Sequence, residues 1–319
     1  MPFMDLHCDA LSRLLANRRA GGTDTLRSGP GGHVSLEKLR RSGYLLQAFA
    51  LFTDRSRTEN PLAEALIQAD LFRWEAEANR DWMTPLTGFS QMTEIRAGGR
   101  LAALLTVEDG GVCLGEPALL RVLFRLGVRL VTLTWNHPNE LGQPNGRPGG
   151  LTEAGFACLA EMEGLRMIPD VSHLGDDGFW DVCRAANRPF LASHSCCRAL
   201  RDHPRNLTDG MIRALADRGG IVGLNFYAPF LGPSPVTRTE DLLRHLRHLM
   251  DVGGRDVAAL GSDFDGIDCD LELGDAGSMD RLVRAMDRGG FTPAEIDAVC
   301  WRNAWRFLEE TLPWEASPL

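Results

Sequence analysis

Histidine and carboxylate side chains stand directly after several short apolar runs of this sequence. His7 and Asp9 follow the run PFMDL, Glu108 follows LAALLTV, His173 follows MIPDVS, and His194 closes PFLASH. With His137, which follows the run VRLVTLT closely, four of the eight histidines in the chain stand at such positions. Imidazoles and carboxylates that converge on one place are the ligands that a hard-to-borderline divalent cation prefers. These residues predict a metal site, provided that the apolar runs are strands whose carboxyl ends meet at the same edge of a sheet or barrel.

Taken singly, each of these residues also has a structural interpretation. A histidine at a strand end is often a packed, hydrogen-bonded core residue. Glu108 can cap a helix or face solvent, and Asp263, which ends the run VAALGSD, can cap a turn. The spacing of His7 and Asp9, however, puts both side chains on one face of a strand. The interpretation of all these residues together as a metal site is favoured. Otherwise several unrelated structural roles would have to occur by chance at the same edge of the sheet or barrel.

The apolar runs have the length and composition of buried parallel strands. Each is short and nearly all apolar, as a strand covered on both faces should be, and amphipathic stretches separate them. Eight strand-then-helix units fit a (β/α)8 TIM-type barrel, as a single domain over residues 1–319, better than a doubly wound open sheet, which needs fewer strands. The predicted strands cover residues 2–7, 45–52, 101–107, 128–134, 167–172, 189–194, 221–226 and 257–263.

A barrel of this kind carries its chemistry at the carboxyl ends of its strands. The candidate ligands above stand at these ends. So do Trp135 and His137, after residues 128–134, and Tyr227, after residues 221–226. Asp265 lies two residues beyond Asp263, where we expect it to shape the loop.

Helices are expected between the strands. Residues 61–80 form one candidate, with Leu62, Leu66, Ala69 and Trp74 near helical spacing. Thr152 can cap a second helix, and two capping boxes are predicted, Thr237 with Glu240 and Thr292 with Glu295. His245 and His248 lie one turn apart on what we expect to be an exposed helix.

Composition excludes several classes of protein. The 319 residues are 44% hydrophobic and 24% charged, the balance of a globular chain rather than a disordered one. The net charge of −9, with no basic stripe, argues against nucleic acid or an anionic membrane as the main partner. No apolar run is long enough to span a membrane, and the start MPFMDLHCDA has no signal-peptide pattern. The eight cysteines form no CxxC pair, so we expect reduced thiols and a cytoplasmic location.

The same residues, with their neighbours, resemble the membrane dipeptidase (renal dipeptidase) family, peptidase family M19 of the amidohydrolase superfamily. The similarity runs in family order from residue 5 to about residue 266, and the chain is similar to the compact bacterial members. The matching segments are DLHCD (5–9), TVEDGG (106–111), LTWN (133–136), DVSH (170–173), SHS (193–195), RAL (198–200), RN (205–206), NFY (225–227) and GSDFDG (261–266).

The resemblance implies a zinc-dependent dipeptidase, a metallo-dipeptidase with two zinc ions per chain. It implies that His7 and Asp9 hold one ion, that His173 and His194 hold the other, and that Glu108 bridges them. The substrates are dipeptides, including those with a C-terminal D-residue, and the attacking group is a hydroxide that bridges the metals. Small peptides are then the expected partners, and the family suggests a homodimer.

The resemblance also implies roles for residues outside the metal site. Asp263 would accept the proton of the attacking water, and Arg205, helped by Tyr227, would bind the C-terminal carboxylate of the substrate. One departure concerns the position after the strand LTLT, where mammalian members carry a histidine that stabilises the oxyanion. Trp135 stands there in this chain, and His137 is the candidate to replace that histidine.

The composition supports a carboxylate bridge independently. Many amidohydrolases bridge their metals with a carboxylated lysine near the fourth strand. Lys38 is the only lysine in this chain and precedes the second strand, so a carboxylate must serve instead.

Two other functions remain open from the sequence. A mononuclear amidohydrolase that acts on cyclic amides or as a deaminase would favour an H-x-H pair on the first strand, whereas Asp9 stands here. A metal-free barrel that only binds a small molecule or a protein would leave carboxylates and imidazoles uncompensated at one mouth. Metal content per chain separates the three functions.

Overall fold

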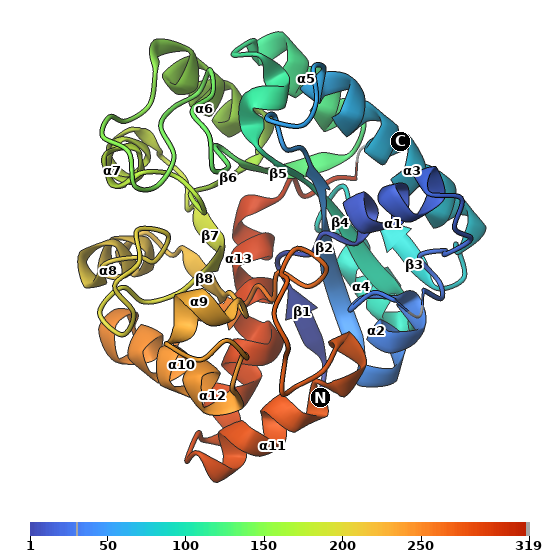
Figure 1. The fold of residues 1–319 in the computed structure, drawn as a ribbon, viewed down its shortest axis with the longest axis vertical. Helices are drawn as coiled ribbons and strands as arrows, with labels where there is room; N and C mark the ends of the chain where they lie inside the picture. The colour runs from blue at the N-terminus through green and yellow to red at the C-terminus, as the bar shows by residue number, and fades with distance from the viewer. Residues whose placement is uncertain (30, 317–319) are drawn as a thin grey trace.

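Eight parallel strands close into a barrel in the structure, a computed structural model that describes residues 1–29 and 31–316. Their order around the barrel is β2-β1-β9-β8-β7-β6-β5-β4, and the pairing of β2 with β4 closes it. Most of the helices lie around these strands, whereas α13 (Asn303–Thr311) is drawn near the centre of this view (Figure 1). The barrel strands are β1 (Phe3–Asp5), β2 (Tyr44–Phe52), β4 (Leu101–Glu108), β5 (Val128–Thr132), β6 (Ile168–Asp170), β7 (Leu191–Ser195), β8 (Ile221–Leu224) and β9 (Ala258–Leu260).

The predicted TIM-type barrel is confirmed, and each of the eight predicted strands overlaps one strand of the barrel. A further short strand, β3 (Met83–Pro85), was not predicted. It pairs with the first residues of β4, next to the stretch of β4 that pairs with β5.

The helices lie between and after the strands. Those of the first half are α1 (Ala10–Arg19), α2 (Leu36–Ser42), α3 (Pro61–Ala78), α4 (Gln91–Ala97), η1 (Gly110–Cys113), α5 (Pro117–Arg125) and α6 (Glu153–Leu165). Those of the second half are α7 (Asp176–Ala185), α8 (Asp209–Asp217), α9 (Ala228–Leu231), α10 (Thr239–Gly253), η2 (Ala276–Ser278), α11 (Asp280–Arg288), α12 (Pro293–Asp297), η3 (Ala298–Arg302) and α13 (Asn303–Thr311). None of the helices in the described ranges combines the length and apolar composition that crossing a bilayer requires.

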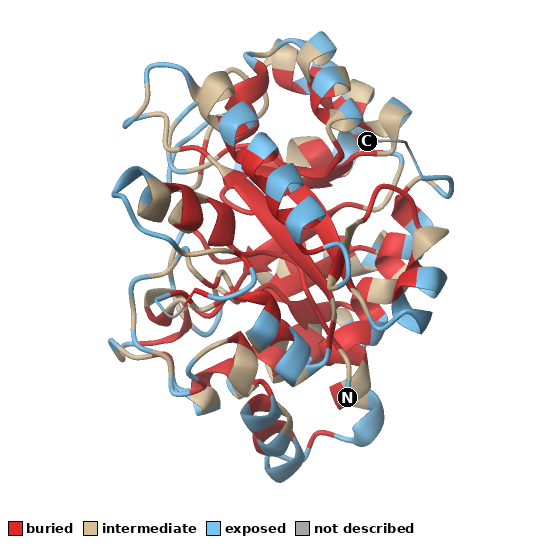
Figure 2. Ribbon diagram, turned by 90° about the vertical axis from the view of Figure 1, so that its right-hand side faces the viewer, coloured by how far each residue is buried: buried red, intermediate tan, exposed pale blue. Residues whose placement is uncertain are grey.

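The barrel strands form the core of the molecule. All eight residues of β4 are buried, and the helices outside present exposed residues to solvent (Figure 2). The register of β2 on β4 pairs Phe52 with Glu108, so Glu108 lies at the carboxyl end of its strand. A buried strand that ends in a carboxylate therefore delivers this charge to the mouth of the barrel.

Side-chain caps define several helix starts as predicted. Thr152 accepts a hydrogen bond from the Gly155 amide at the start of α6. Thr292 and Glu295 form the predicted capping box of α12. The predicted capping box of Thr237 and Glu240 is wrong. Helix α10 begins at Thr239, and the Thr237 hydroxyl donates instead to the carbonyl of Phe226.

Two predictions about helix faces also need correction. On α3, Leu66 and Trp74 are exposed, although their spacing predicted a buried face. On α10, His245 is fully buried, and its ring contacts the Cys197 amide and the Leu231 carbonyl. His248 is partly exposed and pairs with Asp209.

Candidate metal centre

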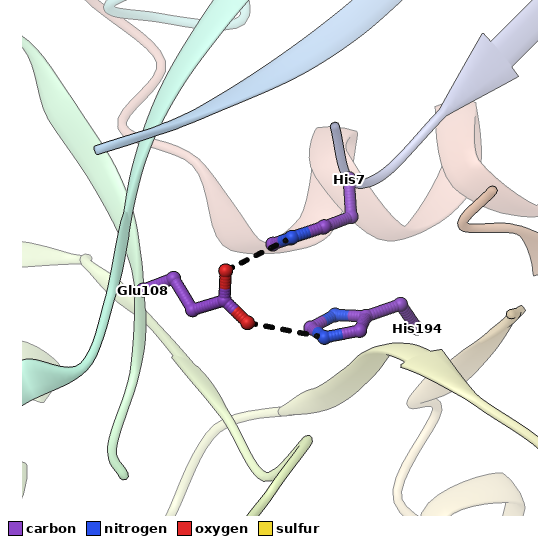
Figure 3. A group of neighbouring side chains, drawn as sticks. All are labelled: His7, Glu108 and His194. Carbon is purple, nitrogen blue, oxygen red and sulfur yellow. Dashed lines mark ion pairs between the residues drawn. The ribbon is translucent and has the colours of Figure 1, made fainter. Parts of the chain in front are cut away.

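The predicted ligands come from four separate strands and meet at one end of the barrel. His7 and Asp9 follow β1, Glu108 is the last residue of β4, His173 lies three residues after β6, and His194 lies within β7. Figure 3 shows the Glu108 carboxylate between the rings of His7 and His194. These two rings stack with their centroids 3.8 Å apart.

The two oxygen atoms of Glu108 face different imidazoles. Oε2 lies 3.3 Å from Nε2 of His7, and Oε1 lies 3.4 Å from Nε2 of His194 (Figure 3). Oε1 also lies 3.0 Å from Nε2 of His173. On the side of Oε2, Nε2 of His7 is also 3.3 Å from the Asp9 carboxylate. Glu108 therefore separates two groups of potential ligands, and one of its oxygens faces each group.

Hydrogen bonds fix which nitrogen of His194 carries its proton. The Ser193 hydroxyl donates its proton to Asp170 at 2.5 Å, so it can only accept from Nδ1 of His194 at 2.7 Å. Nε2 of His194 is then left with a lone pair. Metal-binding imidazoles commonly donate their second ring N–H to a hydrogen-bond acceptor, which fixes the tautomer. Here that acceptor is the Ser193 hydroxyl, which Asp170 orients.

His173 is held in the same tautomer by Asn136. Its Nδ1 lies 2.9 Å from Oδ1 of Asn136, an oxygen that only accepts, so Nδ1 donates. The Nε2 atoms of His173 and His194 consequently approach each other to 2.9 Å with their lone pairs facing. Two facing acceptors at this distance require a cation or a proton between them.

The pKa values of the histidines separate them into two kinds. Burial, helped by the positive charge of Arg205, lowers the pKa of His173 to about 4, and burial also holds that of His194 well below its usual value. Both are neutral at pH 7, as metal ligands must be. Burial alone would lower the pKa of His7, but Glu108 and Asp9 outweigh it and raise that pKa well above the usual range.

The carboxylates are crowded, and this crowding perturbs their pKa values. Burial and the charge of Glu108 raise the pKa of Asp9 to about 6. Burial, with help from Asp9 and Glu108 and against the effect of His7, raises the pKa of Asp263 to about 8. Three carboxylates face one imidazolium, so the site has excess negative charge, and divalent cations compete with protons for it.

Several observations fit this site to a divalent cation. Both ring nitrogens of His7 and Oδ1 of Asp9 are buried without a hydrogen-bond partner among the described residues. The facing ligand atoms lie 2.9 to 3.4 Å apart. Atoms bound to one tetrahedral zinc ion are separated by about 3.3–3.6 Å. His7, Glu108 and His194 form one group that could hold an ion, and His7, Asp9 and Asp263 form another.

Left-handed backbone turns direct the polar side chains into the mouth of the barrel. His173 has φ 67°, and Asp263 has φ 61°. Such values are uncommon outside glycine, are best tolerated by Asn, Asp and His, and are concentrated at functional sites. Gly266 leaves room for this arrangement, because a Cβ atom there would lie 2.2 Å from Asp9 Oδ2 and 2.5 Å from Asp263 Oδ1.

Sequence reasoning missed the residues that hold the candidate ligands in place. Oδ1 of Asp5 accepts hydrogen bonds from the His7 and Ser262 amides, which ties the ends of β1 and β9 together. Oδ1 of Asp170 does the same for the amides of Ser172 and Ser193, next to His173 and His194. Their signal in the sequence is an aspartate at the end of an otherwise apolar strand.

A cavity of about 400 Å³ opens beside the ligands. Asn225 donates a hydrogen bond at 2.9 Å to Oδ2 of Asp263, which lies in the cavity wall. The lining residues are Asp9, Ser12, Phe52, Glu108, Trp135, Asn136, His173, Tyr227, Phe230, Asp263, Asp265, Gly266, Ile267 and Asp268.

The three predicted substrate-binding residues are placed differently. Tyr227 lines the cavity. Arg205 is buried and is not among the lining residues; its two terminal nitrogens donate to Ser195 Oγ and to the His194 carbonyl, each at 2.8 Å. His137 is not among the lining residues. Its side chain is 44% exposed and packs its ring on Trp135, so the structure does not bring it to the ligands.

Comparison with known proteins identifies the same family from the sequence and from the three-dimensional structure. Residues 1–316 match the family model of the membrane dipeptidases, peptidase family M19. An uncharacterized dipeptidase of Schizosaccharomyces pombe is 29% identical over 300 residues, which are 88% of this chain and 72% of that protein.

Two solved structures superpose on nearly the whole molecule. A metallo peptidase from Rhodobacter sphaeroides, liganded with a phosphinate mimic of the dipeptide L-Ala-D-Ala, has a TM-score of 0.91 and 28% identity. This match covers 98% of this chain and 99% of that one. The dipeptidase AC, a metallo peptidase of family M19, has a TM-score of 0.91 and 30% identity over 98% of both chains.

Proposed function

This chain belongs to the membrane dipeptidase family, peptidase family M19, and is a metallo-dipeptidase, and from this premise we propose that it works with two zinc ions. In this proposal His7 and Asp9 hold one ion, His173 and His194 hold the other, and Glu108 bridges the two. The observation that carries the proposal is the position of the Glu108 carboxylate. One of its oxygens faces His7, and the other faces His173 and His194. Membership of the family disfavours the alternative of an amidohydrolase that acts on cyclic amides or as a deaminase.

The chemistry that such cations supply is Lewis acidity, which makes water more acidic near neutral pH and polarises a peptide carbonyl. The side chains of the protein do the remaining work. We assign the general base to Asp263, which accepts the proton of the attacking water and passes it to the leaving amine. Asn225 supports this role, because its amide holds one carboxylate oxygen of Asp263 while the other faces His7.

The proposed substrates are dipeptides, including those with a C-terminal D-residue. The bound L-Ala-D-Ala mimic in the Rhodobacter sphaeroides relative supports this class. We assign the C-terminal carboxylate of the substrate to Arg205, helped by Tyr227. The buried Nε of Arg205 has no hydrogen-bond partner among the described residues, which supports an anionic partner for the guanidinium.

Substitution of Arg205 by alanine should lower kcat/KM for free dipeptides by roughly 30- to 1,000-fold, since a buried charged contact contributes about 2–4 kcal/mol. Hydrolysis of L-Ala-D-Ala and of its C-terminal amide by both proteins measures this effect. The wild type should cleave the amide poorly, and Arg205→Ala should treat the two substrates alike. A variant that still prefers the free acid by the wild-type factor would remove Arg205 from this role, whereas mere damage to the fold would lower both rates together.

We also propose a cytoplasmic homodimer. The cytoplasmic location is supported by the eight cysteines, all of which are free thiols in the structure. The dimer rests on the family resemblance, and light scattering coupled to size exclusion would test it by giving the mass in solution.

A further inference from the structure

The wall of the cavity outside the ligand set carries charge of one sign. Besides Asp9, Glu108 and Asp263, the lining includes two further carboxylates, Asp265 and Asp268, and no lysine or arginine. A substrate side chain that enters the cavity therefore lies near these two carboxylates. The negative charge that it experiences depends on whether neighbouring groups of the protein neutralise each carboxylate.

Asp265 is already compensated by its neighbours. Its side chain is only 1% exposed and lies 3.3 Å from Nε of Arg13. Its oxygens accept hydrogen bonds from the His33 amide at 2.5 Å and the Val34 amide at 3.3 Å. Asp265 thus anchors the loop before α2, and its charge is not directed at the cavity.

Asp268 has no such compensation. It lies in the same loop, is exposed, and lines the cavity. Burial and the charge of Asp268 raise the pKa of the Tyr227 hydroxyl, and no ion pair involves Asp268 among the described residues. Since no cation is paired with it, Asp268 presents an unneutralised negative charge at the edge of the cavity.

The surroundings of Asp268 suit a cation on an aliphatic stem. The ring of Tyr227 stands edge-on to that of Phe230, with the centroids 5.0 Å apart, and Ile267 adds an apolar surface. A lysine or arginine side chain buries its methylene groups against such surfaces and places its charge beside a carboxylate or over a ring. A glutamate side chain would meet repulsion at the same place.

We infer that Asp268 is a specificity-determining residue that makes the enzyme favour dipeptides with a positively charged side chain. The inference rests on the proposed function, because it names the class of dipeptide that the same site prefers. Asp268 attracts a lysine side chain and repels a glutamate side chain, but its exposure to solvent screens both effects. The value of kcat/KM should therefore be higher for a lysine-containing dipeptide than for its glutamate counterpart by a factor of roughly 2 to 30.

The test compares dipeptides in which lysine, alanine or glutamate occupies first the N-terminal and then the C-terminal position, with alanine as the other residue. The kcat/KM values of the five resulting dipeptides are measured for the wild type, for Asp268→Asn and for Asp270→Asn. Asp270 is the matched control, because it is an exposed aspartate two residues further on that does not line the cavity. The position at which the lysine preference occurs identifies which substrate residue lies beside Asp268.

We expect Asp268→Asn to remove most of the preference for lysine over glutamate and Asp270→Asn to leave it intact. Equal losses in both variants would contradict the inference, because a general change of net charge would then explain them. Hydrolysis of Ala-Ala without any preference for lysine would also contradict it, while leaving the dipeptidase function in place. Failure to cleave any of the dipeptides would contradict the proposed function and this inference with it.

Discussion

Replacement of Asp263 by asparagine is expected to lower kcat by about 10²- to 10⁴-fold, the usual contribution of a positioned general base. Asparagine matches aspartate in size and also tolerates the left-handed backbone at this position, where φ is 61°. The substitution therefore removes the proton acceptor with little change in the fold. Burial raises the pKa of Asp263 to about 8, but nearby divalent charge favours the ionised form that a base requires. Steady-state hydrolysis of L-Ala-D-Ala by zinc-loaded protein measures the change.

Asp265→Asn is the control for this substitution. Asp265 also has positive φ and lines the cavity, but its carboxylate is bound to Arg13 and to two backbone amides. Its substitution should lower the temperature of thermal unfolding and change kcat by less than about tenfold, since it loses structural contacts only. An Asp263→Asn protein with a full set of metals and near-normal turnover would show that the base lies elsewhere.

Substitution of Glu108 by alanine should weaken the binding of both metals, because Glu108 alone faces both groups of ligands. Substitution of a residue that only orients a metal ligand lowers metal affinity by roughly 10- to 100-fold. We expect a larger loss of metal affinity for Glu108→Ala. His173→Ala and His194→Ala should each empty mainly one position. Metal content after dialysis, measured by mass spectrometry, gives the number of ions that each variant retains.

Asn136→Ala provides the matched control for Glu108→Ala. Asn136 orients His173 through one hydrogen bond and has no direct part in the proposed ligand set. Its loss should weaken one position by about 10- to 100-fold and leave the other unchanged. Two tightly held ions in Glu108→Ala, with normal circular dichroism, would exclude Glu108 as the bridge.

The barrel could be predicted because its strands are apolar on both faces. Stretches such as LAALLTV have no polar side to present to water, so composition alone identifies them as buried. Strand β3 could not be identified in this way. It has only three residues, and Pro85 lacks the amide hydrogen that a strand usually donates.

The faces of the helices were harder to predict, because tertiary contacts override hydrophobic spacing. On α3 the buried positions include Gln68 and Glu75, which bind the Phe52 carbonyl and the Leu26 amide. Trp74 lies outside, where the guanidinium of Arg18 stacks over its ring at 4.4 Å. None of these partners is near in sequence, so a helical pattern cannot reveal them.

The clustering of the proposed ligands at one end of the barrel was predictable, whereas the residues that orient them were not. His7, Glu108 and His194 lie at or next to the carboxyl ends of strands, and the rule for parallel barrels brings these ends together. The roles of Asp5, Asp170 and Asn136 depend on hydrogen bonds between loops or strands that meet only in the folded chain. The packing of His137 against Trp135, outside the cavity, likewise depends on a loop conformation that residue order does not specify.

The most direct test of the central claim is a titration of metal-free protein with zinc, followed by dipeptide hydrolysis and by metal analysis of the same samples. If Glu108 bridges two ions, activity should rise until two equivalents are bound per chain, and both ions should remain after removal of excess zinc. Full activity with one bound equivalent, or activity that survives complete removal of metal, would contradict the dinuclear site on which the account depends.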